Sequence, residues 1–265
     1  MFKKLGFKKS AVDHLVFYHR NGDEHAVVAV ATDDVAITLK HKEDVEKLKT
    51  ELRQHWKISD LGELKWYLGF HVRRDRAKRT ISINQQAYIE AMLDHFNLSS
   101  AKPVLTPMDP GAKFLKEQCP STPTQVVKMR GIPYTEGIGS ILWPVMILSP
   151  DCAFAVSTLA QFVQNLVKIH WEALKRMMVY LGSTKALWLT FGGGPLAKPI
   201  AKGYCDTDWA GQLHRHSISG HSFHLGLGAV SWSSKKQYII ALSSTESEYI
   251  ADMPRTQQRS IKPEI

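Results

Sequence analysis

The stretch that decides the fold reads GYCDTDWAG at residues 203–211, and it is followed by SWSSKKQ at 231–237 and LSSTESEY at 242–249. From residue 200 onward the pattern predicts a strand ending in the carboxylate of Asp206, then hairpin strands that include 220–226 and 229–232. A helix follows and offers a second carboxylate, Glu248. This order of elements predicts a divalent-metal site suited to cutting a phosphodiester bond.

Four polar residues beside these two carboxylates have weaker or different roles. Asp208 lies two residues after Asp206, on the same strand face if the strand continues, and is a secondary candidate ligand. Glu246 is expected to face solvent in the first turn of the helix, where the helix dipole favours an acid. Ser243 or Ser244 is expected to cap that helix.

A second acidic pair, Asp33-Asp34, lies within the otherwise apolar stretch 26–39. The pattern predicts two buried strands joined by a tight turn that carries both acids. Adjacent like charges are costly unless something compensates them, and Mg²⁺ does so through oxygen ligands. A solvated hairpin without metal is the alternative that these residues leave open.

Composition limits the class of protein. The chain has 265 residues, 44% of them hydrophobic and 22% charged, which is ordinary for a globular protein with a buried core. Its formal net charge of +9 favours a polyanionic partner, although a generally basic protein is equally compatible. No apolar run reaches membrane-spanning length and no secretory signal is visible, so we expect no membrane partner.

Cysteine usage indicates a reducing compartment. Cys119, Cys152 and Cys205 are far apart, odd in number and without CxxC spacing, which argues against a disulfide framework or a zinc site. We therefore expect an intracellular protein of the cytoplasm or nucleus.

The first half of the chain alternates helical and strand patterns. Helices are predicted at 41–56 and 86–96, the second with Asn97 near its end, and strands at 66–72 and 80–83. The residues 73–79 between the two strands form a strongly basic tip. Residues 102–123 hold five prolines and are predicted to be an irregular linker.

Helices then resume. Ser149-Pro150-Asp151 predicts a helix start, with the helix continuing to about Gln164. A further helix is predicted at 168–181, ending at Gly182, and a short strand at 187–191.

Taken together, these segments resemble the Pol polyprotein of copia-type LTR retrotransposons. Residues 203–211 and 242–249 resemble the start of its ribonuclease H domain, and 27–37 resemble the reverse transcriptase stretch with an aromatic-x-Asp-Asp turn. Other segments resemble its primer-grip approach, thumb-proximal and connecting regions: 61–69, 83–89, 106–108, 132–140, 149–151 and 170–176.

The resemblance implies an α/β (α+β) fold in three parts. Residues 1–115 are expected to form a partial reverse transcriptase palm and thumb, and 116–199 a linker and helical connection. Residues 200–265 are expected to form a truncated ribonuclease H-like mixed sheet.

The implied function is RNA-directed DNA polymerase and ribonuclease H activity. Its catalytic and metal-binding carboxylates would be Asp33, Asp34, Asp206 and Glu248, with Mg²⁺ or Mn²⁺ as cofactor. Its partners would be RNA, DNA or an RNA–DNA hybrid, and other parts of the polyprotein.

Nucleic-acid contacts are expected from two places. Leu68 and Gly69 belong to the primer-grip-like segment, although Trp66, Tyr67 and Leu68 also fit a purely structural role in the core. Clustered arginines suit phosphate geometry, although a solvated hairpin end is the alternative. The basic tip contributes Arg73, Arg74, Arg76, Lys78 and Arg79.

Three departures from the family pattern weaken the expected activity. Ala31 occupies the aromatic position before the Asp-Asp turn, and neither Asp13 nor Asp23 fits the earlier strand that supplies a third aspartate. After Ala251 the sequence is no longer family-like, and Pro254 is expected to stop the helix. We therefore expect a truncated copy with little or no turnover. The alternatives are a non-catalytic basic nucleic-acid-binding fragment and an inert, partly unfolded remnant.

Overall fold

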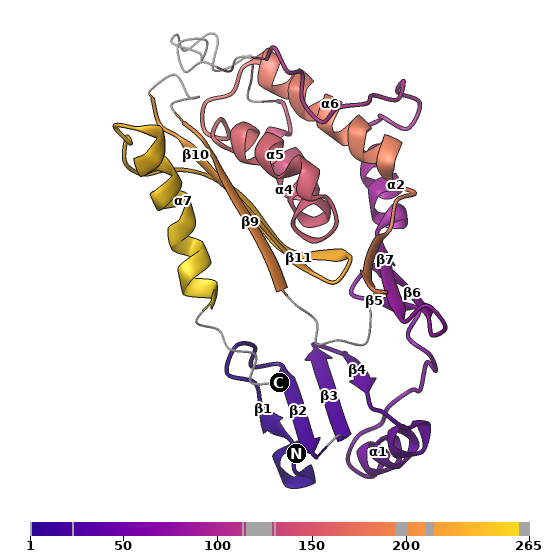
Figure 1. The fold of residues 1–265 in the computed structure, drawn as a ribbon. Helices are drawn as coiled ribbons and strands as arrows, with labels where there is room; N and C mark the ends of the chain where they lie inside the picture. The colour runs from indigo at the N-terminus through magenta and orange to yellow at the C-terminus, as the bar shows by residue number, and fades with distance from the viewer. Residues whose placement is uncertain are drawn as a thin grey trace. The chain divides into compact units, whose positions relative to one another are not determined.

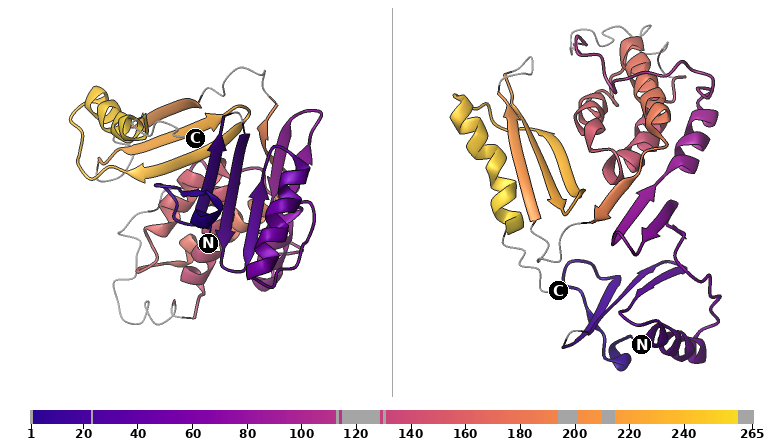
Figure 2. Two further views of the ribbon diagram at one scale, coloured as in Figure 1. Left: turned by 90° about the horizontal axis from the view of Figure 1, so that it is seen from below. Right: turned by 45° about the vertical axis from the view of Figure 1, so that its right-hand side comes forward.

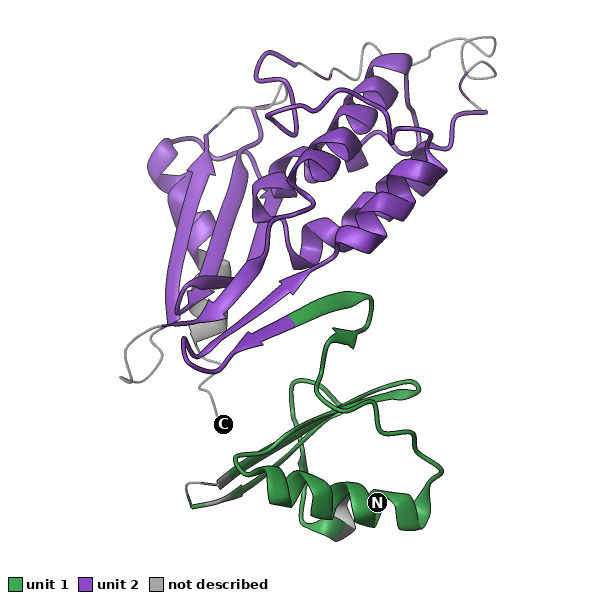
Figure 3. Ribbon diagram, turned by 90° about the vertical axis from the view of Figure 1, so that its right-hand side faces the viewer, with its two compact units in different colours: residues 1–72 green, residues 73–265 purple. Residues whose placement is uncertain are grey.

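The computed structural model describes residues 2–22, 24–112, 114, 129, 131–193, 201–209 and 215–259. The chain divides into two compact units, residues 1–72 and 73–265, and the boundary falls inside strand β6, Phe70–Asp75 (Figure 3). The α+β class predicted from the sequence is confirmed.

The first unit is built on an antiparallel sheet of order β1-β2-β3-β4. Its core joins the sheet to the amphipathic helix through buried Val28, Leu48 and Leu52, with Phe2 and Phe7 beside them. The helix and the two strands around Asp33-Asp34 were predicted and are confirmed, but the burial predicted for both strands is wrong: Val28 of β3 is buried, whereas β4 is exposed to half-buried. The elements are η1 (Phe2–Leu5), β1 (Lys8–Lys9), β2 (Val16–Asn21), β3 (Glu24–Ala31), β4 (Asp34–Thr38) and α1 (Lys42–His55).

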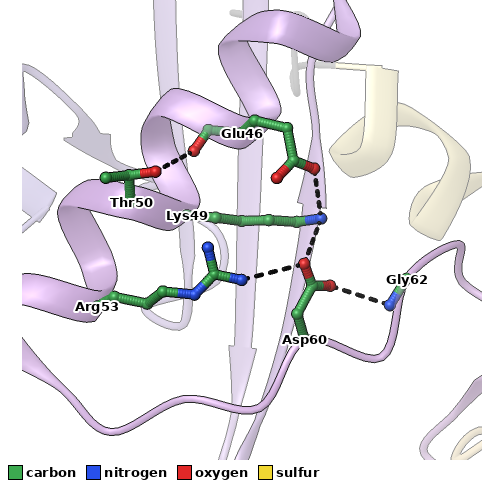
Figure 4. A network of polar contacts seen from close by, with 6 residues as sticks. All are labelled: Glu46, Lys49, Thr50, Arg53, Asp60 and Gly62. Atoms are coloured by element: carbon green, nitrogen blue, oxygen red, sulfur yellow. Dashed lines mark hydrogen bonds and ion pairs between the residues drawn. The ribbon is translucent and has the colours of Figure 1, made fainter.

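A polar network ties the loop after α1 to the helix (Figure 4). Lys49 Nζ lies 2.9 Å from Glu46 Oε1 and 2.9 Å from Asp60 Oδ2, and the Gly62 amide donates to Asp60 Oδ1 at 2.9 Å. The Gly62 amide and the Lys49 ammonium hold the pKa of Asp60 below its ordinary value. These contacts therefore hold the start of the loop that leads to residue 66 against α1.

The strand predicted at 66–72 is two strands. β5 (Trp66–Tyr67) turns back on β6, and β7 (Thr80–Asn84) and β8 (Leu189–Gly192) complete a sheet of order β5-β6-β7-β8. Continuous hydrophobicity concealed the turn, which falls at Leu68-Gly69.

A helical layer forms the larger core of the second unit. Tyr134, Leu159, Leu174, Met177 and Leu181 are fully buried in it. The layer consists of α2 (Gln86–His95), α4 (Tyr134–Ile147), η3 (Pro150–Cys152), α5 (Ala153–Ala160) and α6 (Lys168–Thr184). Asn97 adopts a φ of +56° directly after α2, as expected of a helix-ending residue.

Two predicted helix ends are wrong. The helix expected to reach Gln164 ends at Ala160, and α6 continues through Gly182 to Thr184. A Cβ at Gly182 would lie 2.6 Å from Leu93 Cδ1, so this glycine permits close packing of α6 against α2 rather than ending the helix.

The C-terminal strands β9 (Ala201–Asp208), β10 (Ile218–Leu225) and β11 (Gly228–Lys236) form a sheet of order β11-β10-β9. All their pairings are antiparallel, so the mixed sheet predicted here is not found among the described strands. Helix α7 (Ser244–Arg259) covers one face, and α5 packs against β11 (Figures 1 and 2). Since α7 runs past Pro254, the stop predicted at that proline is wrong.

Three further sequence predictions concern the linker, the cysteines and membrane-spanning segments. Residues 102–112 and 114 hold no helix or strand, and the rest of the predicted linker, with Cys119, lies outside the described residues. Cys152 is buried and Cys205 half-buried, and among the described residues neither forms a disulfide. None of the described helices is long and apolar enough to cross a membrane. The three-part domain division stays a prediction.

His170 makes the stability of the second unit dependent on pH. Its imidazole is fully buried, stacks on Phe162 at 3.9 Å, and burial lowers its pKa to about 4. Below about pH 6.5 the unfolded chain binds a proton that the folded chain does not. The free energy of unfolding should therefore fall as pH drops from 6.5 to 4, by at most about 3 kcal/mol, and level off below.

Urea unfolding at several pH values checks this expectation. His170→Phe should flatten the pH dependence while costing about 1 kcal/mol at pH 7, because the Val167 amide loses its acceptor. His55→Gln, at the exposed end of α1, serves as the control and should keep the wild-type profile. If the free energy of unfolding of His170→Phe depends on pH as it does in the wild type, His170 is not the group responsible.

Gly192 should tolerate no side chain. Its φ is +88°, and a Cβ there would lie 2.2 Å from the Arg79 carbonyl oxygen across the β7–β8 pair. We expect Gly192→Ala to lower the free energy of unfolding by about 2 kcal/mol or more. Gly139→Ala, in α4 with open space around it, should instead raise it by about 0.5–1 kcal/mol. If Gly192→Ala and Gly139→Ala change the melting temperature equally, the close approach of Gly192 to the Arg79 carbonyl oxygen is refuted.

Candidate functional site

The Asp33-Asp34 pair lies on a two-residue hairpin. Ala31 pairs directly with Asp34, so Thr32 and Asp33 form the loop, and Thr32 adopts a φ of +48°. Both aspartates are exposed, and Ala31 is half-buried. The hairpin therefore presents two adjacent carboxylates to solvent, which fits the solvated hairpin that the sequence left open, and the metal site expected there stays a prediction.

The charges of two aspartates of the first unit act on the Tyr67 hydroxyl. Burial raises the pKa of the Tyr67 hydroxyl, and the charges of Asp34 and Asp13 raise it further. All three residues belong to the first unit. Asp13 lies in the loop between β1 and β2, where its Oδ1 accepts the Leu15 amide at 2.8 Å. In the sequence, Asp13 does not fit the earlier strand that would supply a third aspartate. No sequence pattern connects Asp13 with Tyr67.

The β5–β6 hairpin places Leu68 and Gly69 at its tip. Trp66 pairs with His71 and Tyr67 with Phe70, so the two tip residues form the entire loop. Their φ values are +50° and +81°, the pattern of a type I′ turn. Positive φ is unfavourable for leucine, and such strain is more often retained where a side chain has a task. Leu68 is 43% exposed, so the core role left open for it does not hold.

The basic tip lies on the hairpin between β6 and β7, as predicted. All five of its cationic side chains are exposed. Asp75 Oδ1 accepts the Lys78 amide at 2.9 Å and orders the turn. The guanidinium of Arg73 lies 5.9 Å from the ring centroid of Trp188. The hairpin end therefore carries all five cations on one exposed turn.

The register of the C-terminal sheet places Asp206 on a defined face. Asp206 pairs with Gly220, and Gly220 pairs with Ser234, so these residues share one face. Trp232, two residues from Ser234, points the same way and donates from Nε1 to the Val145 carbonyl at 3.0 Å. Asp206 is exposed on this face, and its Oδ1 accepts the Thr207 amide at 2.8 Å. Asp208, two residues further along β9, lies on the same face as Asp206 and is also exposed.

Helix α7 covers the other face. Thr207 Oγ1 lies 2.5 Å from Ser247 Oγ, and Cys205 Sγ donates to Asp252 Oδ1 at 3.0 Å. Glu248 is exposed on this helix. Asp206 lies on the opposite face of the sheet from α7, and a joint site of Asp206 and Glu248 stays a prediction.

The start of α7 is a reciprocal cap. Ser243 Oγ accepts the Glu246 amide at 3.1 Å, and Glu246 Oε2 accepts the Leu242 amide at 2.7 Å. Ser243 is the predicted cap. The expectation that Glu246 simply faces solvent is wrong, because its carboxylate holds the backbone ahead of the helix.

The donor set of the turn suits a hard divalent cation. Mg²⁺ is often held by one or two carboxylates together with waters and substrate phosphates, and Asp33 and Asp34 supply oxygen donors of that kind. Among the described residues, no three His, Cys, Asp or Glu side chains form a cluster that could hold a metal by themselves. A cation at this turn would depend on substrate oxygens.

Comparison with known proteins identifies the class. A family model described as reverse transcriptase (RNA-dependent DNA polymerase) matches residues 1–110. The chain is 38% identical over 251 residues to the retrovirus-related Pol polyprotein from transposon TNT 1-94 of Nicotiana tabacum, covering 94% of this chain and 19% of that protein. The chain belongs to the copia-type retrotransposon Pol polyproteins, in their reverse transcriptase region.

Two further relatives extend the comparison. The Pol polyprotein from transposon RE1 of Arabidopsis thaliana is 32% identical over 246 residues, 92% of this chain and 16% of that protein. The secreted RxLR effector protein 161 of Plasmopara viticola is 45% identical over 131 residues, 49% of this chain and 91% of that protein. No solved structure matches. The chain thus spans about a fifth or less of the polyproteins it matches.

The positive φ of Leu68 at the tip of the β5–β6 hairpin should lower the free energy of unfolding. Leu68→Asn should raise the free energy of unfolding by up to about 1 kcal/mol, because asparagine accepts positive φ more readily than leucine. Gly69→Ala should lower it by about 1 kcal/mol. Urea unfolding of both variants checks the pair; a loss of stability in Leu68→Asn would mean that the leucine packs in the core after all.

Proposed function

We propose that this chain holds an RNA–DNA hybrid or single-stranded nucleic acid beside the Asp33-Asp34 turn of a reverse transcriptase region. The single observation that carries the proposal is the exposed Asp33-Asp34 turn, which lies within the stretch that matches the reverse transcriptase family. A nucleic-acid end resting on the Leu68-Gly69 tip would bring its phosphates toward these carboxylates.

In this proposal Asp33 and Asp34 hold Mg²⁺ or Mn²⁺. The bound ion would neutralise phosphate charge and favour attack on a phosphoryl group. The Tyr67 hydroxyl, like any tyrosine hydroxyl at neutral pH, is protonated and can donate a hydrogen bond to a phosphate or sugar oxygen. Asp206 and Glu248 are the corresponding candidates for a ribonuclease H site, with the β9 edge between them.

The proposed activity of the chain by itself is weak. Each acidic pair supplies two carboxylates, and Ala31 offers no ring at the position before the turn. The proposal therefore combines nucleic-acid binding with little turnover, inside the cell and alongside other parts of the polyprotein. A purely non-catalytic binding role remains the second candidate, favoured by the five exposed cations of the basic tip.

Turnover is tested with Mg²⁺-dependent primer extension and RNA–DNA hybrid cleavage by the purified chain. We expect hybrid binding with at most trace product in both assays. Robust extension abolished by Asp33→Asn, or robust cleavage abolished by Asp206→Asn, would contradict the weak-turnover proposal.

Binding is tested by titrating a labelled hybrid at increasing salt. Combining Arg74→Ala, Arg76→Ala and Lys78→Ala should weaken binding and reduce the salt slope by roughly 2–3, because fewer counterions are released. The matched control combines Lys40→Ala, Lys42→Ala and Lys57→Ala, which removes the same charge elsewhere. Equal losses in the two triple variants would assign binding to net charge and not to the tip.

A further inference from the structure

The sheet of the first unit has one face on which neither α1 nor η1 packs. Both helices lie on the other face, where Phe17, Val28 and Ile37 line up across β2, β3 and β4 (Figure 3). Because successive side chains of a strand point to opposite faces, the register defines the second face, called here the open face. All of its residues are exposed or half-buried: Lys8, Val16, Tyr18, Arg20, His25, Val27, Ala29, Ala31, Asp34, Ala36 and Thr38.

Positive and negative charge lie at opposite corners of the open face. Lys8 pairs directly with Tyr18, and Arg20 lies two residues further along β2, so two exposed cations flank the tyrosine. The Cβ atoms of such diagonal neighbours are about 7–8 Å apart. Within the described part of the chain, neither cation pairs with a carboxylate. Asp34, in the opposite corner, is the one acid among the strand residues of this face.

Strand geometry gives the distance between these two corners. Tyr18 lies opposite Val27, and Val27 lies opposite Thr38, which is four residues along β4 from Asp34. Two strand spacings of about 4.8 Å and four residues of about 3.4 Å place Tyr18 roughly 17 Å from Asp34. At a rise of about 3.4 Å per base, this distance equals about five base steps of a duplex.

The chemistry of the open face matches the backbone of a duplex. Lysine, arginine and tyrosine side chains all donate hydrogen bonds to phosphate oxygens, and such contacts position a duplex without reading its sequence. Between the cations and Asp34, the side chains of Ala29, Ala31 and Ala36 are small and offer no ring on which an unpaired base could stack. The face therefore suits a paired hybrid better than a single strand.

We propose that the open face binds the RNA–DNA hybrid, with Lys8, Tyr18 and Arg20 holding backbone phosphates about five base steps from the end that lies at the Asp33-Asp34 turn. These three side chains position the hybrid, and the two aspartates hold the cation at its end. The inference rests on the proposed nucleic-acid function, to which it adds an anchoring point and a preference for the duplex.

The first test combines Lys8→Ala with Arg20→Ala and titrates a labelled hybrid at increasing salt. Affinity should fall roughly tenfold and the salt slope by about 2, because two phosphate contacts are lost. The matched control combines Lys9→Ala with Lys42→Ala, which removes the same charge: Lys9 pairs with Phe17 on the other face, and Lys42 begins α1. The control should keep most of the affinity. All four side chains are exposed, so both variants should melt as the wild type does.

The second test locates the contact along the hybrid. A hybrid closed by a hairpin loop presents one free end, and a single uncharged methylphosphonate link is moved along each of its strands. The wild-type chain should lose affinity when the link lies about four to six steps from the free end. The Lys8→Ala, Arg20→Ala variant should lose nothing further at those positions.

The outcomes separate this inference from the proposed function. Equal losses in the two double variants, or a methylphosphonate effect that persists without Lys8 and Arg20, overturn the open-face site and leave the proposed function intact. A single strand that binds as tightly as the hybrid, with the same dependence on Lys8 and Arg20, overturns the preference for a duplex. A wild-type chain that binds no nucleic acid overturns both proposals.

Discussion

Repulsion between the neighbouring carboxylates Asp33 and Asp34 is the constraint on which the polymerase-like part of the molecule depends. The two residues are adjacent in the chain and both are exposed, so solvent screens their charges. Under the proposed function, a nucleic-acid end with its cation would compensate them far better, because the ion adds charge of the opposite sign at close range.

Strand alternation sets a second constraint at the other acidic pair. Because Asp206 and Trp232 share a face of the C-terminal sheet, the side chain of Asp206 points away from α7, which carries Glu248. The two carboxylates cooperate only if Glu248 reaches around β9, which is the edge strand of the described sheet. The polymerase-like turn has no such obstacle, since its carboxylates are adjacent in sequence.

The sequence predicted those parts of the fold that depend on local pattern. The hairpin at Asp33-Asp34, the amphipathic α1 and the strand order from residue 201 follow from hydrophobic period and turn residues, and all are confirmed. It failed where tertiary packing overrides local preference. Gly182 looks like a helix end but serves close packing against Leu93, and the apolar run 66–72 hides a turn that requires positive φ in a leucine.

The candidate site was predictable to a similar extent. Adjacent acids in a turn are visible in the sequence, so Asp33 and Asp34 could be found. The effect of the Asp13 charge on Tyr67 joins segments distant in sequence and has no local signature.

Calorimetric titration of Mg²⁺ into the chain, with and without a bound RNA–DNA hybrid, tests the role of the Asp33-Asp34 turn most directly. Mg²⁺ should bind measurably tighter when the hybrid is present, and Asp34→Asn should abolish that gain while leaving the hybrid bound. If the hybrid does not change the Mg²⁺ affinity, or if the increase in affinity is retained in Asp34→Asn, the Asp33-Asp34 turn does not hold the cation together with the substrate.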